Sequence, residues 1–132
     1  MIKNALASAS KETILVVEDD DLVRELGERI LRQAGYSVLT AKNGQEALQI
    51  YKREPGKIGV VILDLVMPVM GGKECLNELL KIDPAAKVLI STGASDDEGA
   101  KDGVASRAKG FVDKPYCMKR LTQAVHDVLE QD

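Results

Sequence analysis

Three short runs of consecutive apolar residues constrain the fold of this chain most strongly. They cover residues 13–17, 58–63 and 87–91, and they are rich in Val and Ile without the alternation of a half-buried strand. Continuous runs of this kind are typical of strands that are buried on both faces of a parallel sheet. Two weaker candidate strands cover residues 36–40 and 110–113.

Segments with helical spacing separate these runs. Leu22, Leu26 and Ile30 recur at four-residue intervals and predict one apolar helix face. Gly35 follows, at a position where a helix C-terminus favours a left-handed residue. A last amphipathic helix is predicted near the C-terminus, starting at Met118.

Two further helices are predicted from their boundary residues. Asn43 with Glu46 forms the pattern of a capping box, which opens a helix that ends before Pro55. Gly71 or Gly72 opens the next helix, which ends before Pro84.

The helix between the fourth and fifth strands is the weakest. Ser95 and Glu98 again form a capping-box pattern, but Gly99 and Gly103 lie inside the segment. Each interior glycine costs about 1 kcal/mol relative to Ala. We therefore expect a short or mobile helix here.

The alternation of strands and helices predicts an α/β fold, a doubly wound parallel sheet with helices on both faces. The 132 residues fit one domain. Residues 1–11 are rich in Ala and Ser and lack the apolar stretch of a secretory signal. We expect a flexible N-terminal segment at 1–11 and one domain over 12–132.

Composition excludes several classes of partner. The net charge of −3 does not favour direct binding of nucleic acid. No apolar run approaches the roughly 20 residues that cross a membrane. Cys75 and Cys117 have neither the spacing of a metal motif nor the number of a disulfide framework, so we expect reduced thiols and a cytoplasmic location.

Polar residues gather at the carboxyl ends of the predicted strands, where parallel sheets bind ligands. Glu18 and Asp19 follow the first strand, Asp64 the third, Thr92 the fourth and Lys114 the fifth. Carboxylates about 5 Å apart repel by roughly 3 kcal/mol per pair at an effective dielectric constant of ~20. One lysine cannot neutralise three of them, and an all-oxygen site suits Mg²⁺. Asp20 is interpreted as a helix-start residue.

Asp64 is the predicted nucleophile. We expect its carboxylate to be ionised at neutral pH without assistance. A carboxylate can attack phosphorus directly and form an aspartyl phosphate. Lys114 and Mg²⁺ would offset the charge of the transferring group, and Thr92 would hydrogen-bond a phosphoryl oxygen.

The motifs at these strand ends resemble those of response regulator receiver domains of two-component systems, in the manner of chemotaxis regulators. The resemblance covers residues 12–130. Its motifs are Val16-Val17-Glu18-Asp19, Leu63-Asp64-Leu65-Val66-Met67-Pro68, Ser91-Thr92-Gly93 and Phe111-Val112-Asp113-Lys114-Pro115. The segment Lys114-Pro115-Tyr116 also looks similar to the receivers of hybrid histidine kinases.

The resemblance implies a (βα)5 flavodoxin-like three-layer sandwich with strand order 2-1-3-4-5. It implies that Asp64 is the phosphoacceptor and that Mg²⁺ or Mn²⁺ is bound, Asp19 being a more direct ligand than Glu18. The implied metal ligands are Glu18, Asp19, Asp64 and the backbone carbonyl of Val66. The implied switch residues are Thr92, Lys114 and Phe111, with Pro115 as a candidate cis proline.

The function implied by this resemblance is a phosphorelay switch. A histidine kinase or histidine phosphotransfer protein would donate the phosphoryl group, and an effector would bind the last helix and the face of the fourth helix. The domain would promote its own phosphorylation without being an enzyme in the turnover sense. Two alternatives stay open: a pseudo-receiver that only binds partners, and an aspartyl-phosphate phosphatase, which would require an acid where Val66 stands. A stand-alone regulator and a hybrid-kinase receiver also both remain open.

Overall fold

A five-stranded parallel sheet lies at the centre of the computed structural model, which describes residues 12–67, 69–93 and 106–131. The strand order is β2-β1-β3-β4-β5, which confirms the predicted doubly wound, flavodoxin-like topology. The strands are β1 (Thr13–Val17), β2 (Ser37–Ala41), β3 (Ile58–Asp64), β4 (Val88–Thr92) and β5 (Gly110–Asp113).

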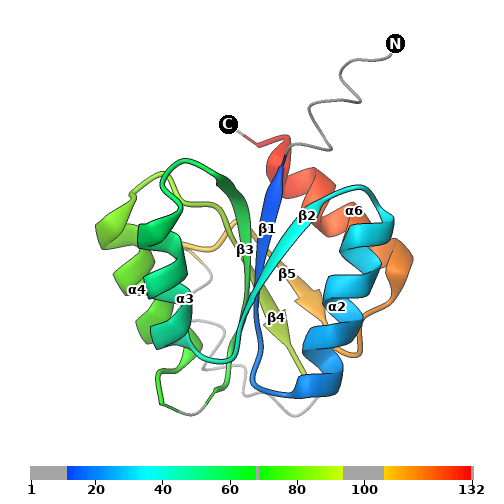
Figure 1. Ribbon diagram of the computed structural model, residues 1–132, viewed down its shortest axis with the longest axis horizontal. Helices are drawn as coiled ribbons and strands as arrows, with labels where there is room; N and C mark the ends of the chain where they lie inside the picture. Colours follow the sequence, from blue (N-terminus) through cyan, green and yellow to red (C-terminus); the bar gives the residue numbers. More distant parts are fainter. Residues whose placement is uncertain (1–11, 68, 94–105, 132) are drawn as a thin grey trace.

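Helices cover both faces of the sheet (Figure 1). On one face lie α3 (Gly44–Arg53) and α4 (Gly72–Ile82), and on the other lie α2 (Asp21–Gln33) and α6 (Met118–Leu129). None of the helices in the described ranges is long and apolar enough to cross a membrane. The predicted N-terminal segment and the predicted fourth helix lie outside the described residues.

Two hydrophobic clusters sandwich the sheet, and β1 contributes to both. Leu15 and Val17 pack in the cluster beneath α3 and α4, whereas Ile14 and Val16 pack in the cluster beneath α2 and α6. Successive side chains of a strand point to opposite faces. Burial of both faces therefore explains why the strand sequences are continuous apolar runs rather than alternating ones.

The predicted apolar face of α2 is partly wrong. Ile30 is buried as expected, but the side chain of Leu22 is 77% exposed and that of Leu26 is 39% exposed. At 3.6 residues per turn, each four-residue step drifts by about 40° around the helix. Leu22 is thus rotated by about 80° from Ile30, and the buried residues of α2 are Gly27, Ile30 and Leu31.

Helix boundaries follow the predicted capping residues. Gly35 has φ of 101°, and the N–H groups of Gly35 and Tyr36 donate to the carbonyls of Arg32 and Leu31, the pattern of a Schellman motif. Asn43 accepts from the N–H of Glu46 at 2.8 Å. The carboxylate of Glu46 accepts from the N–H of Lys42, one residue before the partner that a capping box specifies.

β3 and β4 each extend one residue beyond the predicted end, so that Asp64 and Thr92 are the last residues of their strands. The N–H of Leu65 donates to the carbonyl of Ser91 at 3.0 Å, and this bond continues the ladder just past Asp64. Because the strands are parallel, their carboxyl ends share one edge of the sheet, the lower edge in Figure 1. This edge carries the candidate site.

Candidate functional site: an acidic cluster at the carboxyl edge of the sheet

Three carboxylates converge at this edge. Glu18, Asp19 and Asp64 each offer an oxygen, and these oxygens all lie within 4.8 Å of one another. Glu18 and Asp64 are buried, whereas Asp19 is exposed. A hard divalent cation fits such a donor set, since it contains only oxygen atoms and is open to solvent on the side of Asp19. The predicted convergence of the three acidic residues is confirmed.

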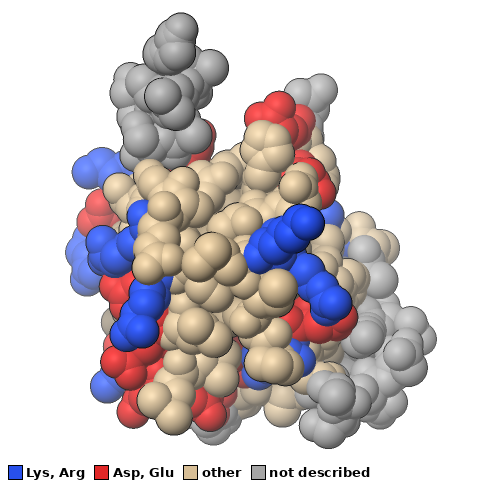
Figure 2. Space-filling model, turned by 90° about the vertical axis from the view of Figure 1, so that its right-hand side faces the viewer, with Lys and Arg blue, Asp and Glu red and all other residues tan. Residues whose placement is uncertain are grey.

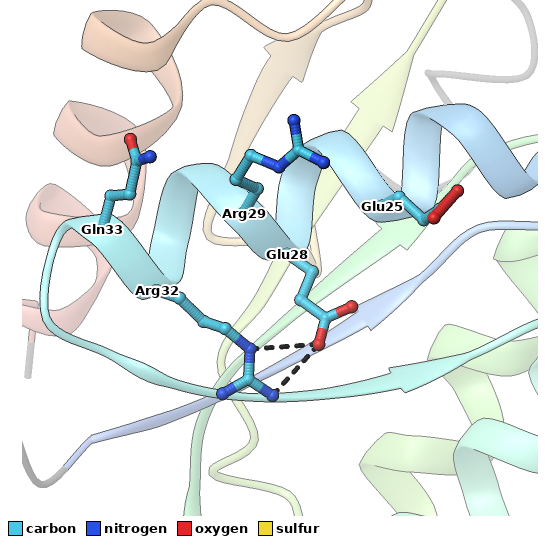
Figure 3. A pocket seen from close by; sticks show the side chains of 5 residues that line it. All are labelled: Glu25, Glu28, Arg29, Arg32 and Gln33. Carbon is cyan, nitrogen blue, oxygen red and sulfur yellow. Dashed lines mark hydrogen bonds and ion pairs between the residues drawn. The ribbon is translucent and has the colours of Figure 1, made fainter.

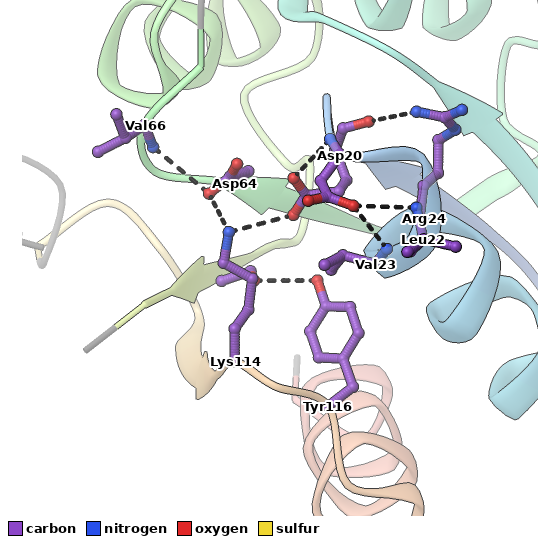
Figure 4. Close-up of polar contacts among 10 residues, drawn as sticks. Asp20, Leu22, Val23, Arg24, Asp64, Val66, Lys114 and Tyr116 are labelled. Atoms are coloured by element: carbon purple, nitrogen blue, oxygen red, sulfur yellow. Dashed lines mark hydrogen bonds and ion pairs between the residues drawn. The ribbon is translucent and has the colours of Figure 1, made fainter. Parts of the chain in front are cut away.

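Lys114 bridges the two buried carboxylates (Figure 4). Its Nζ lies 3.2 Å from Oε1 of Glu18 and 3.1 Å from Oδ1 of Asp64. The Lys114–Pro115 peptide bond is cis, as predicted. The side chain of Lys114 therefore places one positive charge between two buried carboxyl groups.

Glu18 and Asp20 fix the path of the chain from β1 into α2. Oε2 of Glu18 accepts from the N–H of Asp20 at 3.0 Å, and the carbonyl of Glu18 accepts from Arg24 at 2.9 Å. Asp20 accepts from the N–H groups of Leu22 and Val23 and so caps α2, as predicted. Both carboxylate oxygens of Glu18 are thereby engaged within the protein.

The expectation that Asp64 is ionised without assistance is wrong. Burial, and after it the neighbouring carboxylate of Glu18, raise the pKa of Asp64 from 3.8 to about 7 against the lowering effect of Lys114. Burial disfavours the charged form of a carboxyl group. In the absence of a metal ion, a substantial fraction of Asp64 is therefore protonated at neutral pH.

Of the predicted switch residues, Lys114 contacts the cluster, whereas Thr92 and Phe111 lie on the strands β4 and β5. Thr92 is buried, and its hydroxyl donates to Oδ1 of Asp113 at 3.3 Å. Phe111 is 39% exposed rather than enclosed in the core. Asp113 was not predicted as a site residue. Its proximity to Thr92 follows from the pairing of β4 with β5, in which Thr92 is opposite Asp113.

Tyr116 is a second residue at this edge that was not predicted as a site residue. Its buried hydroxyl donates to Oγ of Ser91 at 2.9 Å, and burial raises the pKa of Tyr116 to about 12. A Cβ on Gly27 would lie 3.1 Å from the ring of Tyr116. The absence of a side chain at Gly27 thus lets α2 pack closely over the residue that follows Lys114 and Pro115.

The connection from β3 to α4 borders Asp64. The N–H of Val66 is 3.5 Å from Oδ1 of Asp64, and the N–H of Gly72 donates to the carbonyl of Leu65 at 3.0 Å. Val69 has φ of 72°, a left-handed conformation that is unusual for a β-branched residue. The role of the Val66 carbonyl as a metal ligand stays a prediction.

Two surface hollows lie away from the acidic cluster. One of about 420 Å³ is lined by side chains of α2 alone, including the ion pair between Arg32 and Glu28 (Figure 3). The other, of about 240 Å³, lies where α3 and α4 end, beside the hydrogen bond from Tyr51 to Asp83. Neither is lined by a residue of the acidic cluster.

Comparisons with known proteins agree with this arrangement. The model of the response regulator receiver domain family matches residues 14–126. Sensor kinase CckA of Brucella abortus is 37% identical over 130 residues, which are 98% of this chain and 14% of that protein. Chemotaxis protein CheY of Thermotoga maritima is 33% identical over 116 residues, which are 87% of this chain and 95% of that protein.

A solved structure is similar at the level of the fold. It is the CheX-CheY-BeF3-Mg+2 complex from Borrelia burgdorferi, with a TM-score of 0.82, 29% identity, and coverage of 91% of this chain and 90% of that one. The family match spans most of the chain, and the acidic cluster lies where the sequence motifs place it. The chain therefore belongs to the response regulator receiver domains of two-component systems.

Proposed function

We propose that this domain is a phosphorelay switch that accepts a phosphoryl group on Asp64 from a histidine kinase or a histidine phosphotransfer protein. The observation that carries the proposal is the environment of Asp64. Its buried carboxylate lies 3.1 Å from Lys114 Nζ and within 4.8 Å of two further acidic groups. A nucleophile, a cation and a candidate metal site thus meet at one strand end.

In the proposed reaction, an oxygen of Asp64 forms a bond to phosphorus while the bond from phosphorus to the donor nitrogen breaks. The electron pair of the broken bond leaves with the imidazole of the donor histidine. Lys114 stabilises the negative charge on the transferring oxygens, and Thr92 donates to one of them after reaction. The domain supplies positioning and charge, and it is not an enzyme in the turnover sense because its own side chain is modified.

The acidic cluster suits Mg²⁺ or Mn²⁺ as the resident ion. Asp19 and Asp64 would hold it together with the Val66 carbonyl. Glu18 would act through hydrogen bonds, because both of its carboxylate oxygens already have partners. When bound, the ion supplies positive charge beside the reacting phosphoryl group. That charge also favours the ionised form of Asp64, the form that can attack phosphorus.

The first turn of α2 and the start of α6 are the proposed docking surface of the phosphodonor. Leu22 on α2 and Met118 on α6 are exposed apolar residues, and Leu22 lies two residues after the cap Asp20 beside the acidic cluster. Figure 2 shows this side of the molecule, where uncharged residues occupy much of the middle. The effector is proposed to bind α6 and the segment that was predicted as the fourth helix.

The context of the domain in a longer protein is also a proposal. The similarity to sensor kinase CckA, of which the chain spans 14%, favours the receiver of a hybrid kinase. The coverage of 95% of chemotaxis protein CheY equally suits a stand-alone regulator. A cytoplasmic location is proposed for either case, and the two free cysteines are consistent with it.

Intact-mass spectrometry after incubation with acetyl phosphate and Mg²⁺ tests the phosphoacceptor. We expect one added phosphoryl group on the parent, none on Asp64→Asn, and none on the parent in EDTA. Asp127→Asn, which removes an exposed charge from α6, is the matched control and should be modified like the parent. A folded parent that stays unmodified with Mg²⁺ bound, and also with a phosphorylated histidine phosphotransfer protein, would support the pseudo-receiver alternative.

A further inference from the structure

The hydroxyl of Thr92 has a carboxylate partner in the unphosphorylated domain. It donates to Oδ1 of Asp113 at 3.3 Å. Thr92 and Asp113 are the last residues of β4 and β5 and lie opposite each other in the parallel ladder. Neither the motifs nor the proposed phosphoryl chemistry gives Asp113 a role.

The backbone at this pair is fixed, so the direction of the hydroxyl depends on the side chain. The N–H of Lys114 donates to the carbonyl of Thr92 at 2.7 Å, which holds the two strand ends together. Along β5, Phe111 and Asp113 are exposed, whereas Val112 between them is buried. Asp113 therefore lies on the same face of the sheet edge as Phe111.

A threonine hydroxyl carries one proton and can donate one hydrogen bond at a time. While that proton is directed to Asp113, it is not available to a phosphoryl oxygen on Asp64. The two acceptors exclude each other, because a change of acceptor requires Thr92 to rotate or move. This conclusion rests on the proposed function, in which Thr92 binds the phosphoryl group.

We propose that Asp113 is a positioning residue that holds the Thr92 hydroxyl in the unphosphorylated state and competes with the phosphoryl group for it. Asp113 thereby sets how readily the domain switches, without touching the reacting atoms. Loss of the Asp113 carboxylate should strengthen binding of a phosphoryl group by roughly two- to tenfold, the range that corresponds to one ordinary hydrogen bond.

The test measures binding of beryllofluoride, a mimic of the phosphoryl group, in the presence of Mg²⁺ by ¹⁹F NMR. We expect Asp113→Ala to bind it two- to tenfold more tightly than the parent. Asp113→Asn keeps an acceptor oxygen without the charge, so its affinity should stay closer to that of the parent than to that of Asp113→Ala. Asp127→Ala removes an exposed carboxylate from α6 and should leave the affinity unchanged.

A double-mutant cycle separates this role from a merely structural one. In a Thr92→Val background the hydroxyl is absent, so Asp113→Ala should no longer change the affinity for beryllofluoride. In the metal-free parent, three-bond couplings of the Thr92 methyl group should report one side-chain rotamer. The same couplings should report several rotamers in Asp113→Ala.

Two results would overturn the proposal. One is equal affinity of the parent and Asp113→Ala for beryllofluoride, and the other is a Thr92 rotamer that is unchanged by the substitution. If Asp113→Asn binds as tightly as Asp113→Ala, charge repulsion rather than the hydrogen bond is responsible, and the positioning role is also rejected. If the folded parent binds no beryllofluoride, the phosphoacceptor proposal fails instead, and the metal-free couplings still decide the role of Asp113.

Discussion

Asp64 combines two requirements that oppose each other. Its burial fixes the carboxyl group beside Lys114, but burial and the neighbouring Glu18 also raise the pKa of Asp64 to about 7. Lys114 offsets part of that effect through its contact with both carboxylates. A bound cation would complete the charge balance, so the nucleophile and the metal site depend on each other.

This raised pKa predicts a pH-dependent stability in the metal-free domain. Folded Asp64 keeps its proton up to about pH 7, whereas the unfolded carboxyl loses it near 3.8. The stabilisation from Asp64 is therefore complete below pH 3.8 and is lost as the pH rises through about 7. Asn has no titrating proton, so the Asp64→Asn variant does not lose this stabilisation. The free energy of unfolding of the variant minus that of the parent should therefore increase by about 2 kcal/mol as the pH rises from 5 to 8.

Urea unfolding in EDTA at several pH values measures this difference. The parent and the Asp64→Asn variant should diverge between pH 5 and pH 7 and then run parallel above pH 8. A stability difference that does not change over this range would mean that Asp64 is ionised throughout, and the assigned effect of burial would be wrong.

Removal of the Lys114 charge should have opposite effects on the stability of the fold and on the affinity for Mg²⁺. Lys114→Gln leaves Glu18 and Asp64 without their shared cation and should destabilise the metal-free domain by about 2–3 kcal/mol. The same change removes a positive charge from the edge of the metal site, so Mg²⁺ should bind a few-fold more tightly. Lys109→Gln, at an exposed lysine before β5, is the control, and calorimetric titration with Mg²⁺ is the measurement. Weaker Mg²⁺ binding by Lys114→Gln would contradict this account.

At the scale of single elements, the turn into α4 holds Asp64 in place through a close contact of two backbones. A Cβ on Gly72 would lie 2.6 Å from the carbonyl oxygen of Asp64 and 2.8 Å from Leu65. A Cβ on Gly71 would meet nothing within 4 Å. The two adjacent glycines therefore differ sharply in their tolerance of a side chain.

The same substitution at both positions tests this difference. Gly72→Ser should lower the free energy of unfolding by about 2 kcal/mol or more, because the end of β3 must shift. The same shift should slow phosphorylation by acetyl phosphate. Gly71→Ser should be neutral or stabilise by a few tenths of a kcal/mol, because Gly71 is the N-cap of α4 and lacks a capping side chain. Thermal unfolding and phosphorylation rates measure both, and equal effects of the two variants would refute the close-contact argument.

The positions of the strands were predictable from the sequence more reliably than their exact ends. β1 has the predicted bounds, because an apolar run that is buried on both faces has few alternatives. β5 also has the predicted bounds, although only Val112 of its four residues is buried. Leu22 and Leu26 were misplaced because four-residue spacing alone does not say which side of the face meets the sheet. The bond from Thr92 to Asp113 depends on the pairing of β4 with β5, which only tertiary structure fixes.

At the scale of the whole molecule, the site exists only when the chain is folded. Lys114 is 96 residues from Glu18 and 50 residues from Asp64 in the sequence, yet it contacts both. The carboxyl ends of parallel strands could be predicted to share one edge of the sheet. The acidic residues and the lysine that follow those strands could therefore be predicted to form the site. The raised pKa of Asp64 could not be predicted, because it depends on how deeply the folded chain buries that carboxyl.

Because the site is assembled from distant segments, it can bind Mg²⁺ only in the folded state. Mg²⁺ should therefore stabilise the fold. An ion that binds only the folded state raises the free energy of unfolding by about 2.7 kcal/mol when its free concentration is one hundred times its dissociation constant. Asp19→Asn should lose most of that gain, whereas Asp21→Asn, two residues further in the first turn of α2, should keep it. Unfolding with Mg²⁺ and with EDTA measures the gain, and an equal gain in both variants would remove Asp19 from the metal site.

The measurement that tests the central claim most directly is the chemical identification of the phosphorylated residue. Borohydride reduces an aspartyl phosphate to homoserine, so the domain is treated with acetyl phosphate and Mg²⁺, reduced, digested and analysed by tandem mass spectrometry. The account predicts homoserine at position 64 and at no other aspartate. Modification at Asp19 with an unmodified Asp64, or a phosphoryl group on His126, would contradict it.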